Sequence, residues 1–115
     1  MNEEALQACV ARHLEHAAMV FTLDDELGTH HGLSWADFVQ LTVLDAAGGA
    51  APATEIARTL RTPASHLLRR LLPLEKTGLV ERAADGNGKR RVVLRPPGRR
   101  LLNEARDTAA NACAP

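Results

Sequence analysis

The sequence predicts a mainly helical protein of the α+β class that forms one domain. With 115 residues, of which 45% are hydrophobic, the chain is long enough to bury one core but hardly two. Ala and Leu supply much of the apolar content, and both favour helix because they lose little side-chain freedom there. A Gly- and Asn-containing segment, residues 85–89, separates two short runs that contain Val and Leu, which is typical of a β-hairpin.

The first predicted element is a long helix from residue 3 to about residue 27. This range has no Pro or Gly, begins with acidic residues where the helix dipole favours negative charge, and repeats apolar residues at helical intervals. Gly28 is expected to end it. A second helix follows from Trp35 to about Ala47, with Ser34 as its cap. Because this helix is apolar on most sides, we expect it to be central and buried.

A helix-turn-helix is predicted next. Ala53 to Arg61 has its apolar residues on one face, and a further helix from Pro63 to Thr77 begins after only one or two residues. Thr62 before Pro63 favours a helix start, because the N–H that Pro lacks is not needed in the first turn. Pro73 is expected to bend the last turn of the second helix without ending it.

The remaining residues predict a hairpin and a last helix. The two strands are expected at Leu79 to Ala83 and Arg91 to Arg95, and Pro96-Pro97-Gly98 is expected to close the hairpin. An Ala-rich helix from about Arg99 to Ala112 completes the order helix, helix, helix-turn-helix, hairpin, helix.

Charge is unevenly distributed along a chain whose formal net charge is zero. Residues 58–100 hold twelve Lys and Arg against three Asp and Glu, a net charge of +9, whereas residues 1–57 hold one Arg against nine acids, a net charge of −8. A merely solvated charged face is one explanation. Regional asymmetry of this kind also indicates a polyanionic partner.

The second helix of the helix-turn-helix separates leucines from polar residues when its positions are plotted at about 100° per residue. A DNA major groove suits the polar half, since Ser and His hydrogen-bond base edges or phosphates and Arg binds guanine bidentately. The polar side chains here are Thr62, Ser65, His66, Arg69, Arg70 and Lys76. The hairpin tip adds Lys89, Arg90 and Arg91, and two basic projections fit a major groove and the adjacent minor groove.

Three segments of the chain resemble the MarR family of bacterial winged-helix transcriptional regulators. They are His31 to Ser34, Pro73 to Arg82 and Arg91 to Leu102, and the resemblance extends over about residues 27–105. It implies a winged helix-turn-helix with a two-stranded hairpin as wing. It also implies a homodimer that binds pseudo-palindromic double-stranded DNA, for which we expect the role of a repressor.

The resemblance also assigns residues. Ser65, His66 and Arg69 match the family's DNA-facing recognition-helix positions, and Asp85, Arg90 and Arg91 match its acidic and basic wing segment. Residues 30–96 are then the DNA-binding core, whereas residues 1–29 and 97–115 are dimerisation helices.

The chain departs from the family pattern in three places. Gly86-Asn87-Gly88 separates the acidic and basic wing residues, and Arg95 stands where a Thr commonly caps the following helix. The chain also stops 17 residues after Gly98, where the family usually continues into another dimerisation helix. We therefore expect a short family member whose first and last helices supply the dimer contact.

Histidines and cysteines offer alternative sites. Some relatives sense zinc, but we interpret the histidines as surface and turn residues because none has a paired Cys or carboxylate at a diagnostic spacing. They are His13, His16, His30 and His31. Cys9 and Cys113 lie near opposite ends and are interpreted as free thiols, with redox sensing as the alternative. No cofactor is expected.

The aromatic residues and the acidic run complete the alternatives. Relatives bind aromatic acids between helices, so Phe21, Trp35 and Phe38 are candidates for a small aromatic effector, although we favour core packing. The acidic run of residues 24–26 splays around a helix, so we expect no enzyme. The acidic start and the lack of a stretch of roughly 20 apolar residues favour a cytoplasmic protein with no membrane partner. A winged helix used only for protein assembly remains the alternative function.

Overall fold

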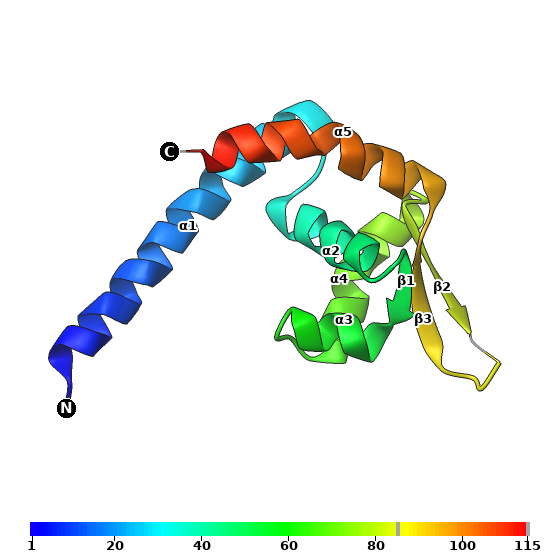
Figure 1. Ribbon diagram of the computed structural model, residues 1–115, viewed down its shortest axis with the longest axis horizontal. Coiled ribbons are helices and arrows are strands. Elements are labelled where there is room, and N and C mark those ends of the chain that lie inside the picture. The colour runs from blue at the N-terminus through cyan, green and yellow to red at the C-terminus, as the bar shows by residue number, and fades with distance from the viewer. Residues whose placement is uncertain (85, 115) are drawn as a thin grey trace.

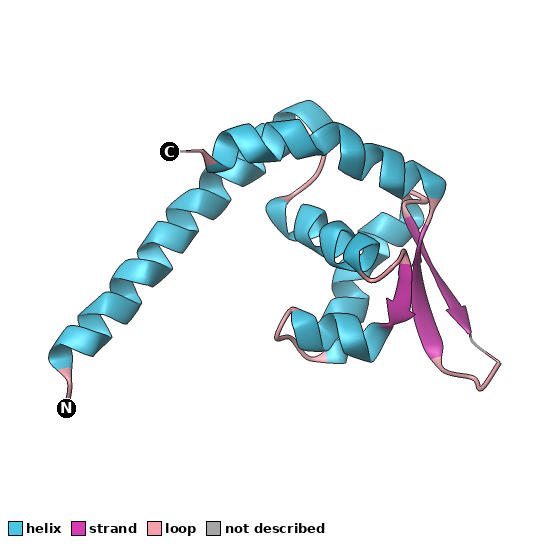
Figure 2. Ribbon diagram, viewed as in Figure 1, coloured by secondary structure: helices cyan, strands magenta, loops and turns pink. Residues whose placement is uncertain are grey.

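The computed structural model describes residues 1–84 and 86–114 of the chain. The helical body carries a small sheet on one side (Figures 1 and 2). The elements in chain order are α1 (Glu3–His31), α2 (Trp35–Ala46), β1 (Ala50–Pro52), α3 (Ala53–Thr59), α4 (Ala64–Lys76), β2 (Val80–Ala84), β3 (Arg90–Leu94) and α5 (Pro96–Cys113). The predicted class and the winged helix-turn-helix order are confirmed.

Helix α1 is longer than predicted, and the expectation that Gly28 ends it is wrong. The helix continues to His31, and Gly32 takes the left-handed conformation with φ of 69°. The N–H groups of Gly32 and Leu33 donate to the carbonyls of Gly28 and Leu27 at 3.2 and 3.3 Å. These bonds and the burial of Leu33 stabilise a helix end at Gly32. Gly28 can stay inside the helix because a glycine there costs only about 1 kcal/mol.

Helix α2 begins as the sequence predicts. Ser34 Oγ accepts from the Asp37 N–H at 3.0 Å, and Asp37 Oδ2 accepts from the Ser34 N–H at 3.2 Å, which makes a capping box. The helix lies in the middle of the molecule and buries Phe38, Leu41 and Leu44. The expectation that it is central and buried is confirmed.

The start of α4 differs from the prediction. Thr62 does not cap the helix. Pro63 lies at the N-cap position, not in the first turn, and its backbone is extended, with φ of −62° and ψ of 143°. The helix therefore begins at Ala64, and no side chain among the described residues caps it. As predicted, α4 continues through Pro73, reaching Lys76.

The sheet has a third strand that the sequence analysis missed. Strand β1 pairs antiparallel with β3, with Ala51 opposite Val92, and the strand order is β1-β3-β2. The two-stranded wing predicted from the sequence is therefore the outer part of a three-stranded sheet. Its third member joins the wing to the start of α3.

Helix α5 begins earlier than predicted, because Pro96 and Pro97 occupy its first turn instead of closing the hairpin. Pro is well tolerated there. Gly98 is buried in the same turn, and a Cβ at this position would lie 2.2 Å from the Leu79 carbonyl oxygen. Only glycine lets α5 pack this closely against the backbone that leads into β2.

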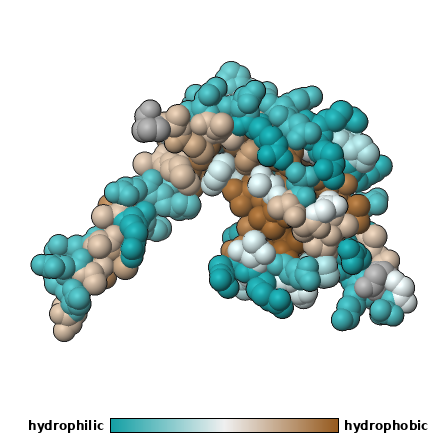
Figure 3. Space-filling view, in the orientation of Figure 1, coloured by the Kyte–Doolittle hydropathy of each residue, from teal (hydrophilic) through white to brown (hydrophobic). Residues whose placement is uncertain are grey.

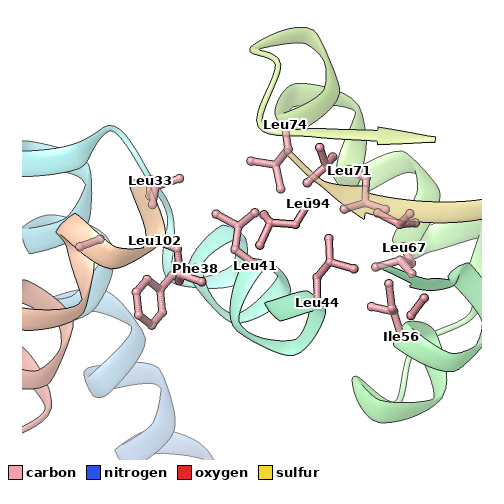
Figure 4. Packing of buried hydrophobic residues seen from close by; sticks show 14 of the residues in the cluster. Leu33, Phe38, Leu41, Leu44, Ile56, Leu67, Leu71, Leu74, Leu94 and Leu102 are labelled. Atoms are coloured by element: carbon pink, nitrogen blue, oxygen red, sulfur yellow. The ribbon is translucent and has the colours of Figure 1, made fainter. Parts of the chain in front are cut away.

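A single buried cluster holds these elements together (Figure 4). The side chains of Leu33, Phe38 and Leu102 lie at the α5 side of the cluster, whereas Ile56 and Leu67 lie at the side of α3 and α4. Between α2 and α5, Asp45 pairs with Arg99 and, at 3.0 Å, with Arg106.

The N-terminal part of α1 projects away from this body (Figure 1). Only the C-terminal part of the helix is packed: Leu23 and Leu27 are fully buried, and α1 lies against α5 there. Residues 3–18 are all exposed, and we call them the arm. Within the described residues, none of the helices has the length and hydropathy needed to cross a membrane.

Candidate nucleic-acid interface

Helix α4 separates its faces as the sequence predicts. Leu67, Leu71 and Leu74 are buried against the core, while the opposite face is exposed. The exposed polar side chains of α4 are Ser65, His66, Arg69, Arg70 and Lys76. Leu72 is an exception to the apolar side, with 42% of its surface exposed. The helix therefore presents two arginines, a histidine and a hydroxyl to solvent from a face fixed by buried leucines.

The turn before α4 is tight and its backbone is constrained. Arg61 has a φ of 55°, which lies in the left-handed region that residues other than glycine rarely adopt. The Thr62 N–H donates to the Ala57 carbonyl at 3.0 Å, which ties the turn back to α3. Thr62 is half-buried, so it is less accessible than Ser65 and His66 in the first turn of α4.

The β2–β3 hairpin carries the second basic group. Arg90 lies opposite Ala84 and Arg91 opposite Ala83, at the outer end of the ladder. Lys89 and Arg90 are exposed, whereas Arg91 is half-buried, because successive strand residues point to opposite faces of the sheet. Arg90 is thus the more accessible arginine of the pair. Asp85, which the sequence analysis assigned to the wing, lies outside the described residues.

Both basic groups lie toward one edge of the molecule. The N-terminal end of α4, beside α3, and the hairpin tip both lie at the lower edge of the view in Figure 1. The same edge is hydrophilic in the space-filling view, whereas hydrophobic residues gather beneath α5 (Figure 3). The arrangement provides two separate basic projections on one side of the body.

Two further arginines belong to this edge and were not named as site residues from the sequence. Arg58 lies in the last turn of α3 and Arg61 in the turn that follows, and both are exposed. They precede α4 directly, so they flank its N-terminal end. Both fall within the basic segment of residues 58–100, which is the signal that the sequence offered for them.

The aromatic residues do not form one cluster. Trp35 and Phe38 stack with ring centroids 5.6 Å apart, and Phe38 is buried. Phe21 has 78% of its surface exposed, so the expectation that it packs in the core is wrong. It lies on a face of α1 that the described residues leave uncovered. An open cleft between α1 and α5, of about 740 Å³, is lined mainly by polar side chains, with no aromatic ring among them except histidines.

The histidines and cysteines lie mostly at the surface. His13 and His16 are exposed on the arm, and His30 pairs with Glu26 at 3.5 Å. His31 is half-buried in α1 itself, with its Nε2 2.8 Å from Thr108 Oγ1 of α5. Cys9 and Cys113 are free, as predicted, and both are exposed. Over residues 1–84 and 86–114, no three His, Cys, Asp or Glu residues are grouped so as to hold a metal ion.

No protein-family model and no curated protein sequence matches the chain. The transcriptional regulator BldR from Sulfolobus solfataricus is similar in structure, with a TM-score of 0.82 and 24% identity over 96% of this chain and 81% of BldR. Sco3205, a MarR family transcriptional regulator from Streptomyces coelicolor in complex with DNA, gives a TM-score of 0.85 and 20% identity over 97% of this chain and 75% of its own. An organohalide-sensing transcriptional regulator in a 2,4-dichlorophenol-bound form gives a TM-score of 0.81 and 19% identity over 97% of this chain and 66% of the regulator. The chain has the winged-helix fold of MarR family regulators.

Proposed function

We propose that this chain is a sequence-specific transcriptional regulator that binds double-stranded DNA. The observation that carries the proposal is the exposed basic face of α4 beside an exposed basic hairpin tip, on a fold shared with a regulator solved on DNA. In this arrangement α4 enters the major groove and the hairpin enters the adjacent minor groove. The proposed activity is binding, with no catalytic step.

The contacts divide by accessibility and chemistry. Arg69 lies one helical turn after Ser65 and His66, so these three side chains read base edges, with Arg69 bridging guanine O6 and N7. Thr62 and Arg70 lie beside this row and contact the phosphate backbone. Lys89, Arg90 and Arg91 hold the hairpin in the minor groove, where a narrow groove attracts Arg and Lys.

A homodimer is part of the proposal, and α1 supports it. Leu23 and Leu27 face the chain's own body, but a second apolar face lies roughly a third of a turn away around the helix. This face, which we call the arm stripe, consists of Leu6, Val10 and Leu14 of the arm and of Phe21 just beyond it, which are between 51% and 78% exposed. An exposed apolar stripe is typical of a protein interface.

A second copy of the chain, packed through the arm stripe and α5, pairs two α4 helices on one duplex. Their half-sites then lie about 34–36 Å, one helical turn, apart and form a pseudo-palindrome. Occupation of such a site in a promoter makes the dimer a repressor.

A small aromatic molecule is the effector we propose for this regulator. A regulator of the same fold is solved with 2,4-dichlorophenol, and Trp35 of this chain is half-buried beside Phe38 at the start of α2. Trp35 is the only tryptophan, so intrinsic fluorescence reports on this place alone. We expect titration with 2,4-dichlorophenol to quench the Trp35 emission in a saturable way; a linear, unsaturated decrease would exclude binding at this place.

The DNA proposal is tested by selecting bound duplexes from a random pool, followed by fluorescence anisotropy on selected and scrambled duplexes. Arg69→Ala is expected to lower the preference for the selected duplex by about 1–3 kcal/mol. Arg90→Ala is expected to weaken binding to both duplexes and to reduce the salt slope by about one. Arg12→Ala removes the one arginine of the arm and serves as the control. It is expected to change neither the preference for the selected duplex nor the affinity with its salt slope.

A protein-assembly module without DNA binding is the second candidate, and the arm stripe is the observation that favours it. The two candidates differ in salt dependence. Neutralising several phosphates makes affinity fall steeply between about 50 and about 200 mM salt. Salt-insensitive binding, equal in the parent and in both variants, would support the assembly module and overturn the DNA proposal.

A further inference from the structure

One side chain joins the β2–β3 hairpin to helix α4 at two points. Arg82, in strand β2, donates through Nε to Glu75 Oε1 and through Nη2 to the main-chain carbonyl of Leu68. Both acceptors belong to α4, and they are seven residues apart along it. Seven residues span about 10 Å of helix, so a single guanidinium fork is attached to α4 over almost two turns.

The attachment lies where α4 is weakest. Pro73 has no N–H, so the helix lacks the bond that residue 73 would donate to the carbonyl of residue 69, and a proline ring crowds that carbonyl. The Leu68 carbonyl is its immediate neighbour, and Arg82 supplies a charged donor there from outside the helix. Arg82 therefore holds the part of α4 in which Pro73 loosens the main chain, directly beside Arg69 and Arg70.

Arg82 is poorly suited to contact DNA itself. Its side chain is 21% exposed, and its charge is paired with the Glu75 carboxylate, whose own side chain is 24% exposed. In the sheet it lies opposite Val92, two positions before the Ala84 and Arg90 pair at the outer end of the ladder. Its guanidinium is used within the protein, between the hairpin and α4.

We propose that Arg82 is a positioning residue that sets the orientation of the β2–β3 hairpin relative to α4, so that the hairpin and helix contacts with DNA form together. This inference rests on the proposed function. A planar guanidinium fork holds two acceptors in a fixed direction, which a lysine ammonium does not, since its flexible stem carries a point charge. Rigid presentation of two contact groups also avoids the entropy of ordering them when they bind.

The test compares Arg82→Lys with the parent on the selected and scrambled duplexes. We expect the ratio of the two affinities to fall about tenfold, while the affinity for scrambled DNA and its salt slope stay unchanged, because the charge is kept. Arg95→Lys is the matched control: Arg95 pairs with Glu81 across 4.0 Å at the exposed surface near the base of the hairpin. This control is expected to leave the ratio unchanged.

A double-mutant cycle provides a measurement that a loss of stability alone does not change. The loss of binding energy for Arg69→Ala and Arg90→Ala is measured singly and together, in the parent and in Arg82→Lys. We expect coupling between the two sites in the parent and additivity in Arg82→Lys. Coupling that persists in Arg82→Lys, or an affinity that falls equally for both duplexes with a smaller salt slope, would overturn the proposal.

Glu75→Gln removes the charged acceptor but keeps the Leu68 contact, so we expect a smaller loss of preference, about threefold. It tests the proposal even if Arg82→Lys does not fold; an unchanged preference in Glu75→Gln would then count against the proposal. If the parent itself selects no sequence and binds without salt dependence, the proposed function fails, and this result is distinct from the failure of Arg82 as a positioning residue.

Discussion

The arm of α1 and helix α4 are both amphipathic, yet the chain covers the apolar face of only one of them. In α4 the leucines Leu67, Leu71 and Leu74 are buried, and polar residues meet the solvent. In the arm every residue is exposed, and the apolar Val10 and Leu14 are 51% and 62% exposed. The basic face of α4 is thus complete in one chain, whereas the arm presents a surface that a single chain leaves unfilled.

The difference follows from what surrounds each helix. Helix α4 is packed against α3 and β2, so its leucines have partners within the same chain. Helix α1 is packed only in its C-terminal part, against α5 and α2, and the arm extends beyond those contacts (Figure 1). Burial of an apolar side chain contributes roughly 1.5–3 kcal/mol, so filling the arm stripe is a substantial reason for two copies to associate.

The largest effect is expected when the arm stripe is made acidic. In the double variant Val10→Glu, Leu14→Glu, burial of two unpaired carboxylates would oppose association, so we expect monomers in sedimentation velocity. Affinity for the selected duplex is expected to fall about 100-fold or more, because one α4 then binds where two had bound together.

The control for this variant carries the same charges on the other side of the arm. Ala5→Glu and Ala8→Glu lie on the side of α1 opposite the arm stripe, so this pair is expected to leave both association and DNA affinity unchanged. Equal behaviour of the two double variants would show that the arm stripe is not the dimer contact. Near-parental thermal unfolding of the core in both variants is the check that the fold persists.

The next largest effect is expected in the winged-helix body, where packing is close. Gly98→Ala introduces a Cβ that would lie 2.2 Å from the Leu79 carbonyl oxygen, so α5 or the start of β2 must move. We expect the free energy of unfolding to fall by about 1–3 kcal/mol in urea denaturation. Gly86→Ala is the control, because a Cβ there meets nothing within 4 Å and the backbone φ is not positive. Equal stability of the two variants would contradict the close contact at Gly98.

The two regions also differ in how well the sequence predicted them. The Ser34 cap and the buried leucines of α4 depend on residues near in sequence and were predicted correctly, whereas the Thr62 cap and the stop at Gly28 were not. Strand β1 was missed because Ala50–Pro52 has little strand preference of its own and pairs with β3, about 40 residues away. Phe21 was assigned to the core because residue type alone does not reveal whether a neighbouring element reaches that far along a helix.

The sequence placed the candidate residues on their helix and hairpin but did not predict the geometry that holds these elements together. The spacing of Ser65, His66 and Arg69 was enough to place them on one face, because the helical period fixes it. The constrained conformation of Arg61 and the attachment of Arg82 to α4 had no such signal. A left-handed residue in a turn and a contact between a strand and a helix both depend on how the elements pack.

The smallest expected effect concerns Arg61, in the body but outside α4. Its φ of 55° is unfavourable by about 1 kcal/mol for a residue other than glycine. Arg61→Gly is therefore expected to raise the free energy of unfolding by about 0.5–1 kcal/mol and to weaken binding to selected and scrambled duplexes alike, by a few fold. Arg61→Ala removes the same charge without relieving the backbone, so it should lose the same affinity and gain no stability. If both variants bind DNA as the parent does, Arg61 makes no contact, and the basic edge is limited to α4 and the hairpin. If the affinity falls while only the glycine variant is stabilised, an arginine in a position that favours glycine is explained by its contact with the phosphate backbone.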